Sequence, residues 1–265
     1  MTDAATAPTF DTIAYSVEDG VAVIALNRPD NLNAMNSALL RDLAAASAAA
    51  EADDAVRVIV LAGEGKGFCS GADLADAAIA ADVEKVLMEG YKPTLDAISA
   101  SAKPWIAAIH GACAGIGASY AMQCDLAVME ESAYMYEAFA AIGLIPDGGA
   151  HWQLVRALGY KRAYAAIVGA EKLPAEACAA AGLVNTVVPD GTARQAALNW
   201  AGRLAQGAPR TMRHAKTVLR AAATESFDES FAREASLQGD CVGSEDAKNA
   251  IAAFFAKRKP VFTGA

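Results

Sequence analysis

The chain has 265 residues, of which 54% are hydrophobic, and its 22 basic and 31 acidic residues give a net charge of −9. A chain this long and this apolar can bury a large core, which excludes an intrinsically disordered protein. The acidic balance provides no general positive field, so nucleic acid and anionic membrane surfaces are excluded as partners, and an anionic ligand would need a local basic patch.

The N-terminal segment and the cysteines indicate the cellular compartment of the protein. The N-terminal segment MTDAATAPTF lacks the basic and then apolar regions of a secretory signal. The five cysteines are odd in number and lack metal-ligand spacing, which predicts buried free thiols. They are Cys69, Cys113, Cys124, Cys178 and Cys241. We therefore expect a cytoplasmic protein.

Four apolar runs predict buried strands, at residues 21–29, 56–63, 103–111 and 124–130. After the first run, Asn36 or Ser37 is suited to cap a helix. Strand, glycine-bearing loop and helix then alternate as far as about Pro189. This alternation predicts an α/β layered fold with its ligand sites on the strand-to-helix loops. The apolar stretch at 105–122 contains His110 and three glycines, so we predict a strand, loop and helix there rather than a membrane span.

Two glycine-rich loops are candidates for presenting free backbone N–H groups. The loop at 64–74, EGKGFCSGADL, lacks the GK[ST] of a phosphate-binding loop, and a plain mobile surface loop is the alternative. The segment at 111–120, GACAGIGASY, has Tyr120 where a dinucleotide fingerprint needs its third glycine. Its pattern instead favours a strand-to-helix turn able to hold an oxyanion.

Histidine spacing predicts no metal site. The three histidines, His110, His151 and His214, are too far apart for a HExxH pattern, and no GxSxG motif is present. We expect each histidine to have a structural role.

The segment at 138–149, AFAAIGLIPDGG, contains a single charged residue, Asp147. Pro-Asp-Gly is ordinary turn chemistry, because proline fixes φ, aspartate bonds nearby backbone and glycine allows positive φ. On local grounds the segment predicts a turn.

The pattern becomes helical from Pro209 to the end of the chain. In the last helix Ser244 is a predicted N-cap, and Lys257, Arg258 and Lys259 suit the negative end of the helix dipole. Its apolar stripe needs a surface to cover it, either the core or another subunit. That stripe consists of Ala247, Ile251, Phe254 and Phe255.

Taken together, six segments resemble the crotonase superfamily, the enoyl-CoA hydratase/isomerase family of acyl-CoA enzymes. They occur in family order between about residues 21 and 264. They read LNRPDNLNAMN, VRVIVLAGEGKGFCSGADL, KPWIAAIHGACAGIGASYAMQCDLAV, IGLIPDGG, AAGLVNTVVP and SEDAKNAIAAFFAKRKPVFTG.

The resemblance implies an α/β fold, a spiral of ββα units that ends in a helical region. It implies a core at 1–200 that binds acyl-CoA and a C-terminal helical region at 201–265 for capping and oligomerisation. A homotrimer or a dimer of trimers is expected, with no cofactor, because coenzyme A is part of the substrate. The segment at 75–91, which is predicted to be helical and mobile, would shape the acyl pocket.

The resemblance also implies site residues. The thioester carbonyl would lie between the backbone N–H groups of Ala72 and Ile116. The residues expected to contact the substrate are Asn31, Leu32, Ala34, Ser70, Ala72, Leu74 and Phe139, with Lys257 near the CoA phosphates. The family commonly has lysine where this chain has Asn31, so the phosphate contacts are expected to be weaker or to come from elsewhere.

The chemistry implied by the resemblance depends on which carboxylates are present. Family members that hydrate a 2-enoyl-CoA use two glutamates, which fall on Ser119 and Phe139 here. Neither residue can orient a water or relay a proton as a carboxylate does. The segment is most similar to enoyl-CoA isomerases and ring-epoxide acyl-CoA isomerases, in which a single acid follows the IGLIP run. Asp147 is then the predicted general acid/base, moving a proton from C2 to C4 of a 3-enoyl-CoA.

Two alternatives remain. Glu137 lies two residues before Phe139 and, on a strand, would share its face, so a hydratase using this acid is the first alternative. A relative that binds acyl-CoA without catalysing a reaction is the second, since fold analogy does not fix function.

Overall fold

The molecule is built on a six-stranded sheet in the order β1-β2-β3-β4-β6-β9. The computed structural model describes residues 8–77 and 81–265. Strands β1 and β2 form an antiparallel pair, and every other neighbouring pair is parallel. The strands are β1 (Ile13–Glu18), β2 (Val21–Leu26), β3 (Val58–Gly63), β4 (Trp105–Ile109), β6 (Leu126–Glu130) and β9 (Thr186–Val188).

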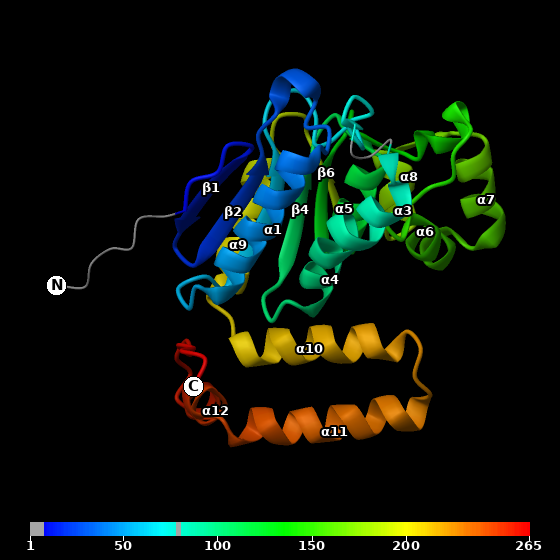
Figure 1. The fold of residues 1–265 in the computed structure, drawn as a ribbon. Helices are drawn as coiled ribbons and strands as arrows, with labels where there is room; N and C mark the ends of the chain where they lie inside the picture. The colour runs from blue at the N-terminus through cyan, green and yellow to red at the C-terminus, as the bar shows by residue number, and fades with distance from the viewer. Residues whose placement is uncertain (1–7, 78–80) are drawn as a thin grey trace.

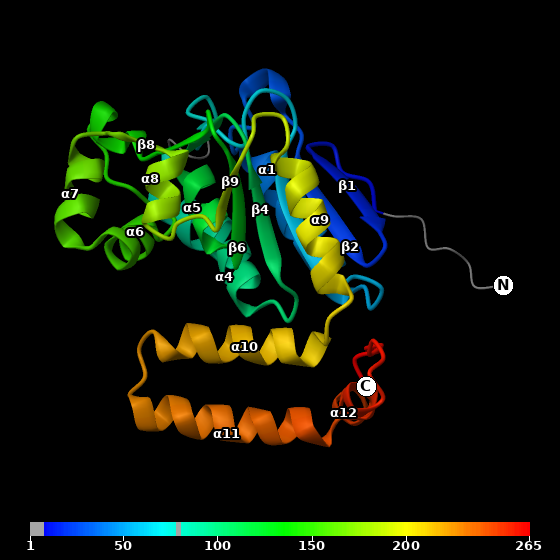
Figure 2. The same ribbon diagram turned by 180° about the vertical axis from the view of Figure 1, so that it is seen from behind.

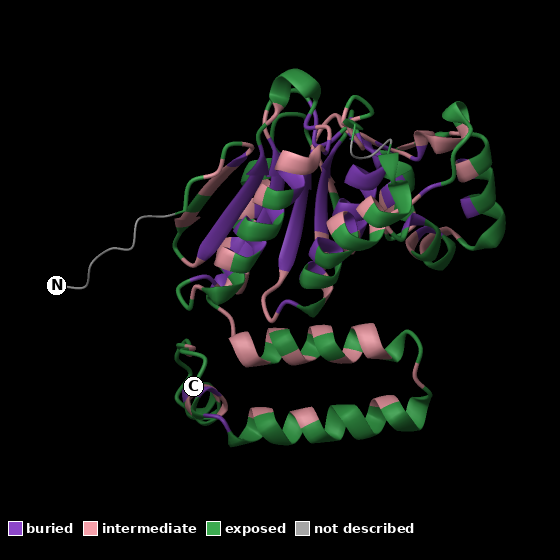
Figure 3. Ribbon diagram, in the orientation of Figure 1, coloured by how far each residue is buried: buried purple, intermediate pink, exposed green. Residues whose placement is uncertain are grey.

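Both faces of this sheet are covered by helices (Figures 1 and 2). Helix α1 (Ser37–Ala52) lies on one face, and α9 (Ala193–Ala205) lies on the other, against β3, β4 and β6. Every residue of β2, β3 and β4 is therefore buried, as Figure 3 shows. Continuous apolar runs are what a strand covered on both faces requires, and the four predicted strands are confirmed.

Local capping explains where α1 begins. The Asn36 side chain accepts a hydrogen bond from the Leu39 N–H at 2.9 Å, so Asn36 rather than Ser37 is the N-cap. The apolar face of Leu39, Leu40 and Leu43 is buried against the sheet.

A second, smaller sheet stands beside the first and contains β5, β7 and β8. Strand β5 (Ala112–Ala114) pairs parallel with β7 (Tyr134–Tyr136), which pairs antiparallel with β8 (Lys172–Pro174). Two isolated parallel bridges, Cys69 with Cys113 and Met35 with Ala72, continue this arrangement beyond β5. Along the chain, a long strand of the main sheet is therefore followed by a short segment that belongs to the second sheet or to one of its bridges.

The remaining helices complete the core and the C-terminal region. Helices α3, α4 and α5, with the π-helical turn η2, lie on the α1 side of the sheet. The core segments are η1 (Pro29–Asn31), α3 (Val83–Lys85), η2 (Val86–Tyr91), α4 (Lys92–Ala100), α5 (Ile116–Gln123), η3 (Ala138–Ile142), α6 (Ala150–Leu158), α7 (Tyr160–Val168) and α8 (Ala175–Ala180). The segment at 83–91 is helical as predicted, whereas 78–80 lie outside the described residues.

The C-terminal region is a layer of helices beneath the core (Figure 1). It consists of α10 (Pro209–Ala222), α11 (Phe227–Gly243) and α12 (Glu245–Phe255). The boundary predicted at residue 200 falls inside α9, whose buried alanines continue to Ala205, so the change to this layer comes after Ala205. The predicted cap of α12 is present, since the Ser244 hydroxyl accepts from the Ala247 N–H at 3.1 Å.

The apolar stripe of α12 is not covered by the core of the same chain. Phe254 and Phe255 are each 78% exposed, and Ile251 is 54% exposed. On α11, Phe227 and Phe231 stack on each other but are also exposed. Surface of this size and kind is typical of a contact between subunits.

The predicted strand, loop and helix at 105–122 are confirmed as β4, β5 and the start of α5. Within the described ranges, none of the helices has the length and apolar character needed to cross a membrane. All five cysteines are free thiols, with Cys69, Cys113 and Cys178 buried as predicted and Cys124 and Cys241 partly exposed.

Candidate active site

Three loops that are distant in sequence, at 28–36, 64–74 and 114–116, meet at one edge of the second sheet. Asn33, which is fully buried, connects two of them through its side-chain amide. Its Nδ2 donates to the carbonyl oxygens of Glu64 and Gly67, both at 2.9 Å, and its Oδ1 accepts from the Arg28 N–H at 2.9 Å. The loop at 64–74 is therefore fixed to the loop at 28–36. This attachment favours an ordered loop that presents its backbone N–H groups over a plain mobile surface loop.

The pairing around Ala72 leaves its own N–H free. Met35 donates its N–H to the Gly71 carbonyl at 2.8 Å and accepts from the Asp73 N–H at 2.9 Å. In a parallel bridge the residue between those two groups points its own N–H toward the opposite edge. On that edge, a Cβ on Gly71 would lie 3.4 Å from the Ala114 carbonyl oxygen. Gly71, the residue before Ala72, thus lies beside the turn at 114–116.

The second N–H comes from the first residue of α5. Gly115 precedes the helix with φ of 50° and ψ of −129°, a conformation available to glycine, so Ile116 begins the helix with no partner in the preceding turn. Within 8–77 and 81–265, neither the Ala72 N–H nor the Ile116 N–H donates a hydrogen bond. The two donors lie on neighbouring segments, as an oxyanion hole requires.

The Phe139 ring packs against this turn. A Cβ on Gly115 would lie 3.5 Å from both Cε2 and Cζ of Phe139. Phe139 belongs to η3 and is partly buried, so its ring forms an apolar wall beside the two N–H groups. This placement agrees with its predicted contact with the substrate.

Asp147 lies in a tight turn that is packed against α5. The Asp147 carbonyl accepts from the Ala150 N–H at 3.1 Å and from the Ser119 hydroxyl at 3.0 Å. The predicted turn is therefore confirmed. The Asp147 side chain, however, does not stabilise it, because the buried Oδ1 has no hydrogen-bond partner in the described part of the chain.

The environment makes Asp147 a stronger base than an exposed aspartate. Burial raises its pKa to about 6. A carboxylate whose pKa lies near neutrality is suited to take up and return a proton. The position beside the turn at 115–116 and the free oxygen together support Asp147 as the reacting acid.

Glu137 is a second buried carboxyl in the same region. It is 4% exposed, and neither of its oxygens has a partner among the described residues. Burial raises its pKa to about 8, and the negative charge of Asp147 adds to the shift. At neutral pH Glu137 is therefore protonated, and a neutral carboxylic acid can donate a hydrogen bond or a proton.

The strand alignment expected for Glu137 and Phe139 is wrong. Strand β7 ends at Tyr136, so Glu137 precedes the short helix that contains Phe139 and the two residues share no strand face. The electrostatic link of Glu137 to Asp147, rather than a shared strand face, places this acid at the site.

Most of the predicted substrate-contact residues lie on the two joined loops. Ser70 donates its N–H to the Leu32 carbonyl at 3.0 Å, which places 31–34 beside 70–74. Asn31, Leu32, Ser70 and Leu74 are exposed, and Ala34 is partly buried. A continuous edge therefore runs from these loops to Ala72.

Lys257 does not join this group within one chain. It follows the end of α12 at Phe255, with a left-handed φ of 51°. Figures 1 and 2 both show α12 beneath α10, on the far side of it from α5. The expected contact with CoA would therefore need Lys257 from another copy of the chain.

An apolar cavity of about 680 Å³ opens beside the Asp147 turn. Its walls come from η2, α4 and the start of α6, with Gln123 of α5 and Arg220 of α10. They include Leu87, Met88, Tyr91, Leu95 and Trp152, with Gly148 and Gly149 at one side. Its size and apolar walls suit an acyl group.

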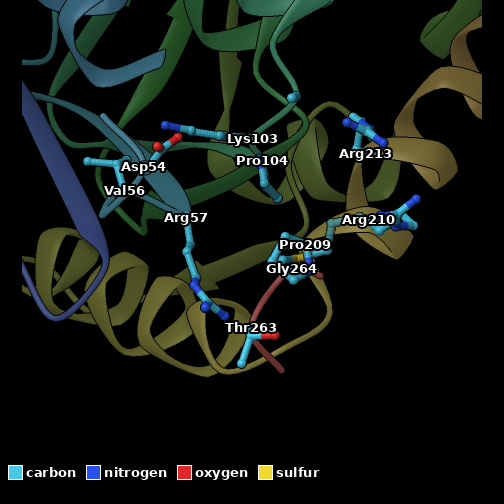
Figure 4. A pocket seen from close by; sticks show the side chains of 12 residues that line it. Asp54, Val56, Arg57, Lys103, Pro104, Pro209, Arg210, Arg213, Thr263 and Gly264 are labelled. Carbon is cyan, nitrogen blue, oxygen red and sulfur yellow. The ribbon is translucent and has the colours of Figure 1, made fainter. Parts of the chain in front are cut away.

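A second cavity, of about 450 Å³, lies between the core and α10 and is lined by four cationic side chains. Figure 4 shows these side chains pointing apart. Arg57 donates to the Phe262 carbonyl, Lys103 to the Ala50 and Asp53 carbonyls, and Arg210 to Asp240. Of these three groups, Arg57 joins the core to the C-terminal segment, Lys103 bonds within the core and Arg210 bonds within the C-terminal layer, so they do not converge on an anion.

Sequence reasoning missed two residues of this region. Asn33 lies inside the quoted motif LNRPDNLNAMN, and its left-handed φ of 56° follows another such residue, Leu32. Consecutive left-handed residues are a conformation that single-sequence patterns do not reveal, although asparagine tolerates it. Tyr91 lies in the segment at 75–91, which was predicted to be helical and mobile and to shape the acyl pocket, but no single residue of it was named. No group of three or more His, Cys, Asp or Glu side chains in the described residues could hold a metal ion.

Comparison with known proteins gives consistent matches. A family model described as enoyl-CoA hydratase/isomerase matches residues 16–265. A Rhodobacter capsulatus protein described as a probable enoyl-CoA hydratase is 40% identical over 96% of this chain and 99% of its own length. The 1,2-epoxyphenylacetyl-CoA isomerase of Escherichia coli is 34% identical over 95% of this chain and 98% of its own. The crystal structure of an enoyl-CoA hydratase from Polaromonas has a TM-score of 0.90 at 32% identity, covering 94% of this chain and 99% of that one.

The Asp147 turn yields a first test, because its two glycines differ in one respect. Both have positive φ, but a Cβ on Gly148 would lie 2.4 Å from Ile116 Cδ1, whereas nothing lies within 4 Å of one on Gly149. We expect Gly148→Ala to displace Asp147 and to lower kcat/KM with an acyl-CoA substrate by on the order of 100-fold. Gly149→Ala is the matched control and should lose only about 1–2 kcal/mol of stability. Equal losses of activity would contradict this explanation.

The buried state of Glu137 yields a second test. Its folded-state pKa of about 8 lies above the usual 4.5, so ionisation disfavours the folded state. The cost is absent below pH 4.5, grows up to about pH 8 and is constant above it, at about 1.4 kcal/mol per unit of pKa difference. Glu137→Gln should therefore gain stability relative to the native protein as the pH rises from 4.5 to 8, measured by denaturant unfolding. The exposed Glu131→Gln serves as the control, and a pH-independent difference for Glu137→Gln would contradict the assignment.

Proposed function

The chain belongs to the enoyl-CoA hydratase/isomerase family, and from this premise we propose that it isomerises acyl-CoA thioesters by moving a double bond from the 3-enoyl to the 2-enoyl position. The observation that carries the proposal is the Asp147 carboxylate, which is buried and unpartnered beside the helix whose first N–H is free.

The two free N–H groups supply the electrostatic part of the mechanism. A thioester carbonyl that accepts from the Ala72 and Ile116 N–H groups gains stabilisation as negative charge develops on its oxygen. Because these donors are fixed by the pairing of the backbone, they need no reorganisation during the reaction. Removal of a proton from C2 then gives a dienolate rather than a free carbanion.

Asp147 supplies the proton transfer. Its ionised carboxylate takes the proton from C2, the electron pair moves into the dienolate, and the protonated carboxyl returns the proton at C4. The double bond then lies between C2 and C3, and Asp147 is ionised again. No proton is gained or lost overall, so the reaction needs neither a cofactor nor a water.

The side chains at the hydratase positions support isomerisation over hydration. Ser119 uses its hydroxyl to hold the Asp147 carbonyl, and the Phe139 ring packs over Gly115. Neither side chain can activate a water, and the apolar Phe139 ring excludes one. The 34% identity to the isomerase of Escherichia coli, whose substrate is an acyl-CoA epoxide, also supports isomerase chemistry.

A second candidate function rests on Glu137. A protonated Glu137 beside an ionised Asp147 forms an acid and a base in one site, which is what addition of water to a 2-enoyl-CoA requires. The relatives described as hydratases favour this candidate. It differs from the first in its requirement for Glu137.

The substrate proposed for both functions is a CoA thioester bound along the edge formed by 31–34 and 70–74. The acyl group would enter the cavity beside Gly148. Free thiols at all five cysteines suit the cytoplasmic location that we propose.

We further propose that the chain assembles as a homotrimer or a dimer of trimers. The exposed aromatic residues of α11 and α12 would then be buried between copies. Such an assembly would also give Lys257 of one copy access to the CoA bound by another.

Asp147→Asn tests the isomerase proposal directly. The amide cannot accept a proton, so isomerisation of a 3-enoyl-CoA and exchange of the C2 proton with D₂O should both fall by on the order of 100-fold or more. In the native protein, kcat/KM should drop tenfold per pH unit below about 6, because Asp147 must be ionised. NMR measures the isomerisation, and mass spectrometry measures the exchange of the C2 proton with deuterium.

The same assays distinguish the two functions. The isomerase proposal expects a 2-enoyl-CoA to remain unhydrated and Glu137→Gln to retain C2 exchange. Rapid hydration of a 2-enoyl-CoA that is lost in both Glu137→Gln and Asp147→Asn would assign the hydratase function instead.

The assembly is tested by light scattering at micromolar concentration. The native protein should have a mass three or six times that of the chain. Replacing both Phe254 and Phe255 by glutamate places charges in the proposed contact and should give monomers of unchanged helical content by circular dichroism. A native protein that is already monomeric would rule out the proposed assembly.

A further inference from the structure

Tyr91 is a buried phenol at the end of a π-helical turn. The turn η2 runs from Val86 to Tyr91 between α3 and α4. Such turns are rare in helices and occur often at functional sites, because the extra residue re-aims a side chain. Tyr91 is 2% exposed, and its hydroxyl has no hydrogen-bond partner in the described part of the chain. A buried hydroxyl without a partner costs free energy, so its retention needs an explanation.

The charges of three carboxylates raise the pKa of Tyr91, and two of these carboxylates are already paired. Asp73 forms an ion pair with Arg28 at 2.9 Å, and Asp76 accepts from the Ser37 N–H and hydroxyl, both at 2.7 Å. The third is Asp147, whose buried Oδ1 has no partner among the described residues. An unpartnered donor and an unpartnered acceptor therefore lie in the same buried region.

Charge couples these two groups more strongly than any other pair around Tyr91. Burial raises the pKa of Tyr91 above its usual range, and the charge of Asp147 is the next largest cause, ahead of Cys69, Asp76 and Asp73. The titratable neighbours that Asp147 influences are Glu137 after β7, Tyr91 on η2 and Tyr120 on α5.

Helix α5 holds both partners. Its Ser119 hydroxyl donates to the Asp147 carbonyl, and its Tyr120 hydroxyl donates to the Tyr91 carbonyl at 3.4 Å. The same helix begins at Ile116, one of the two oxyanion donors. Tyr91 and Gly148 also both line the cavity of about 680 Å³. Occupation of that cavity by an acyl group would press on both walls.

We propose that Tyr91 is a positioning residue for Asp147, its hydroxyl donating a hydrogen bond to the ionised carboxylate and so fixing the oxygen that faces C2. The proposal rests on the proposed function in taking Asp147 as the reacting base. Hydrogen bonds of this kind are often long in a free enzyme and shorten when substrate binds. The bond favours the charged form of Asp147 and opposes the effect of burial.

The test removes the hydroxyl and keeps the ring. In Tyr91→Phe, C2 exchange and kcat should fall roughly tenfold, the loss expected for one hydrogen bond to a charged group, while KM changes less than twofold. The acid limb of the pH profile should move upward. Tyr15→Phe removes a phenol from β1 and is the matched control, with no change expected.

A measurement without turnover keeps the two proposals separate. The Asp147 carboxyl is titrated by NMR in protein that is labelled with ¹³C-aspartate and bound to a saturated acyl-CoA, which has no double bond to move, and its signal is assigned by its loss in Asp147→Asn. Its pKa should rise in Tyr91→Phe and fall when a fluorinated tyrosine, a stronger donor, replaces Tyr91. The fluorotyrosine protein gives the result even if Tyr91→Phe does not fold.

The outcomes are distinct. An Asp147 pKa unchanged in both proteins would overturn the role of Tyr91, whatever the reaction. Full C2 exchange in Asp147→Asn would instead overturn the proposed function, and the shifts in pKa would still report the contact with Tyr91.

Discussion

The site depends on how three short backbone segments pair with one another. Met35 takes one edge of the segment at 71–73, so that Ala72 presents its N–H on the other edge. Cys69 pairs with Cys113 of β5. After the turn at Gly115, α5 begins at Ile116, whose N–H has no acceptor in the preceding turn. Asn33 fixes the two loops through carbonyl oxygens that would otherwise be unpaired. The Ala72 and Ile116 N–H groups are left without acceptors in the described part of the chain.

Helix α5 converts this pairing into the proposed catalytic arrangement. It presents Ile116 at its start, holds the Asp147 turn through Ser119 and holds Tyr91 through Tyr120. A single rigid element therefore sets the distance between the oxyanion donors and the acid. Residues of one helix keep fixed separations, which explains why small changes at Gly148 are expected to matter so much.

The buried carboxyls lower the stability of the folded protein. Asp147 and Glu137 are both removed from water without hydrogen-bond partners for the oxygens named above, and each has a raised pKa as a result. A site with its acid neutralised by a lysine or arginine would be more stable, but it would hold the carboxylate as a weak base. The apolar ring of Phe139 also favours reactivity over stability, because it keeps water away from the groups proposed to react.

The sequence by itself determined the strands, the turn at Asp147 and, through resemblance, the family and the two N–H groups proposed as donors, and it narrowed the cap of α1 to Asn36 or Ser37. These features are local, since apolar runs, capping residues and glycine positions act over a few neighbours. The tertiary structure alone decided that Glu137 and Tyr91 lie near Asp147, that Lys257 is remote from the site of its own chain and that α12 exposes its aromatic stripe. Those facts depend on contacts between residues far apart in the chain, and burial, which sets the pKa of an acid, exists only after the chain has folded.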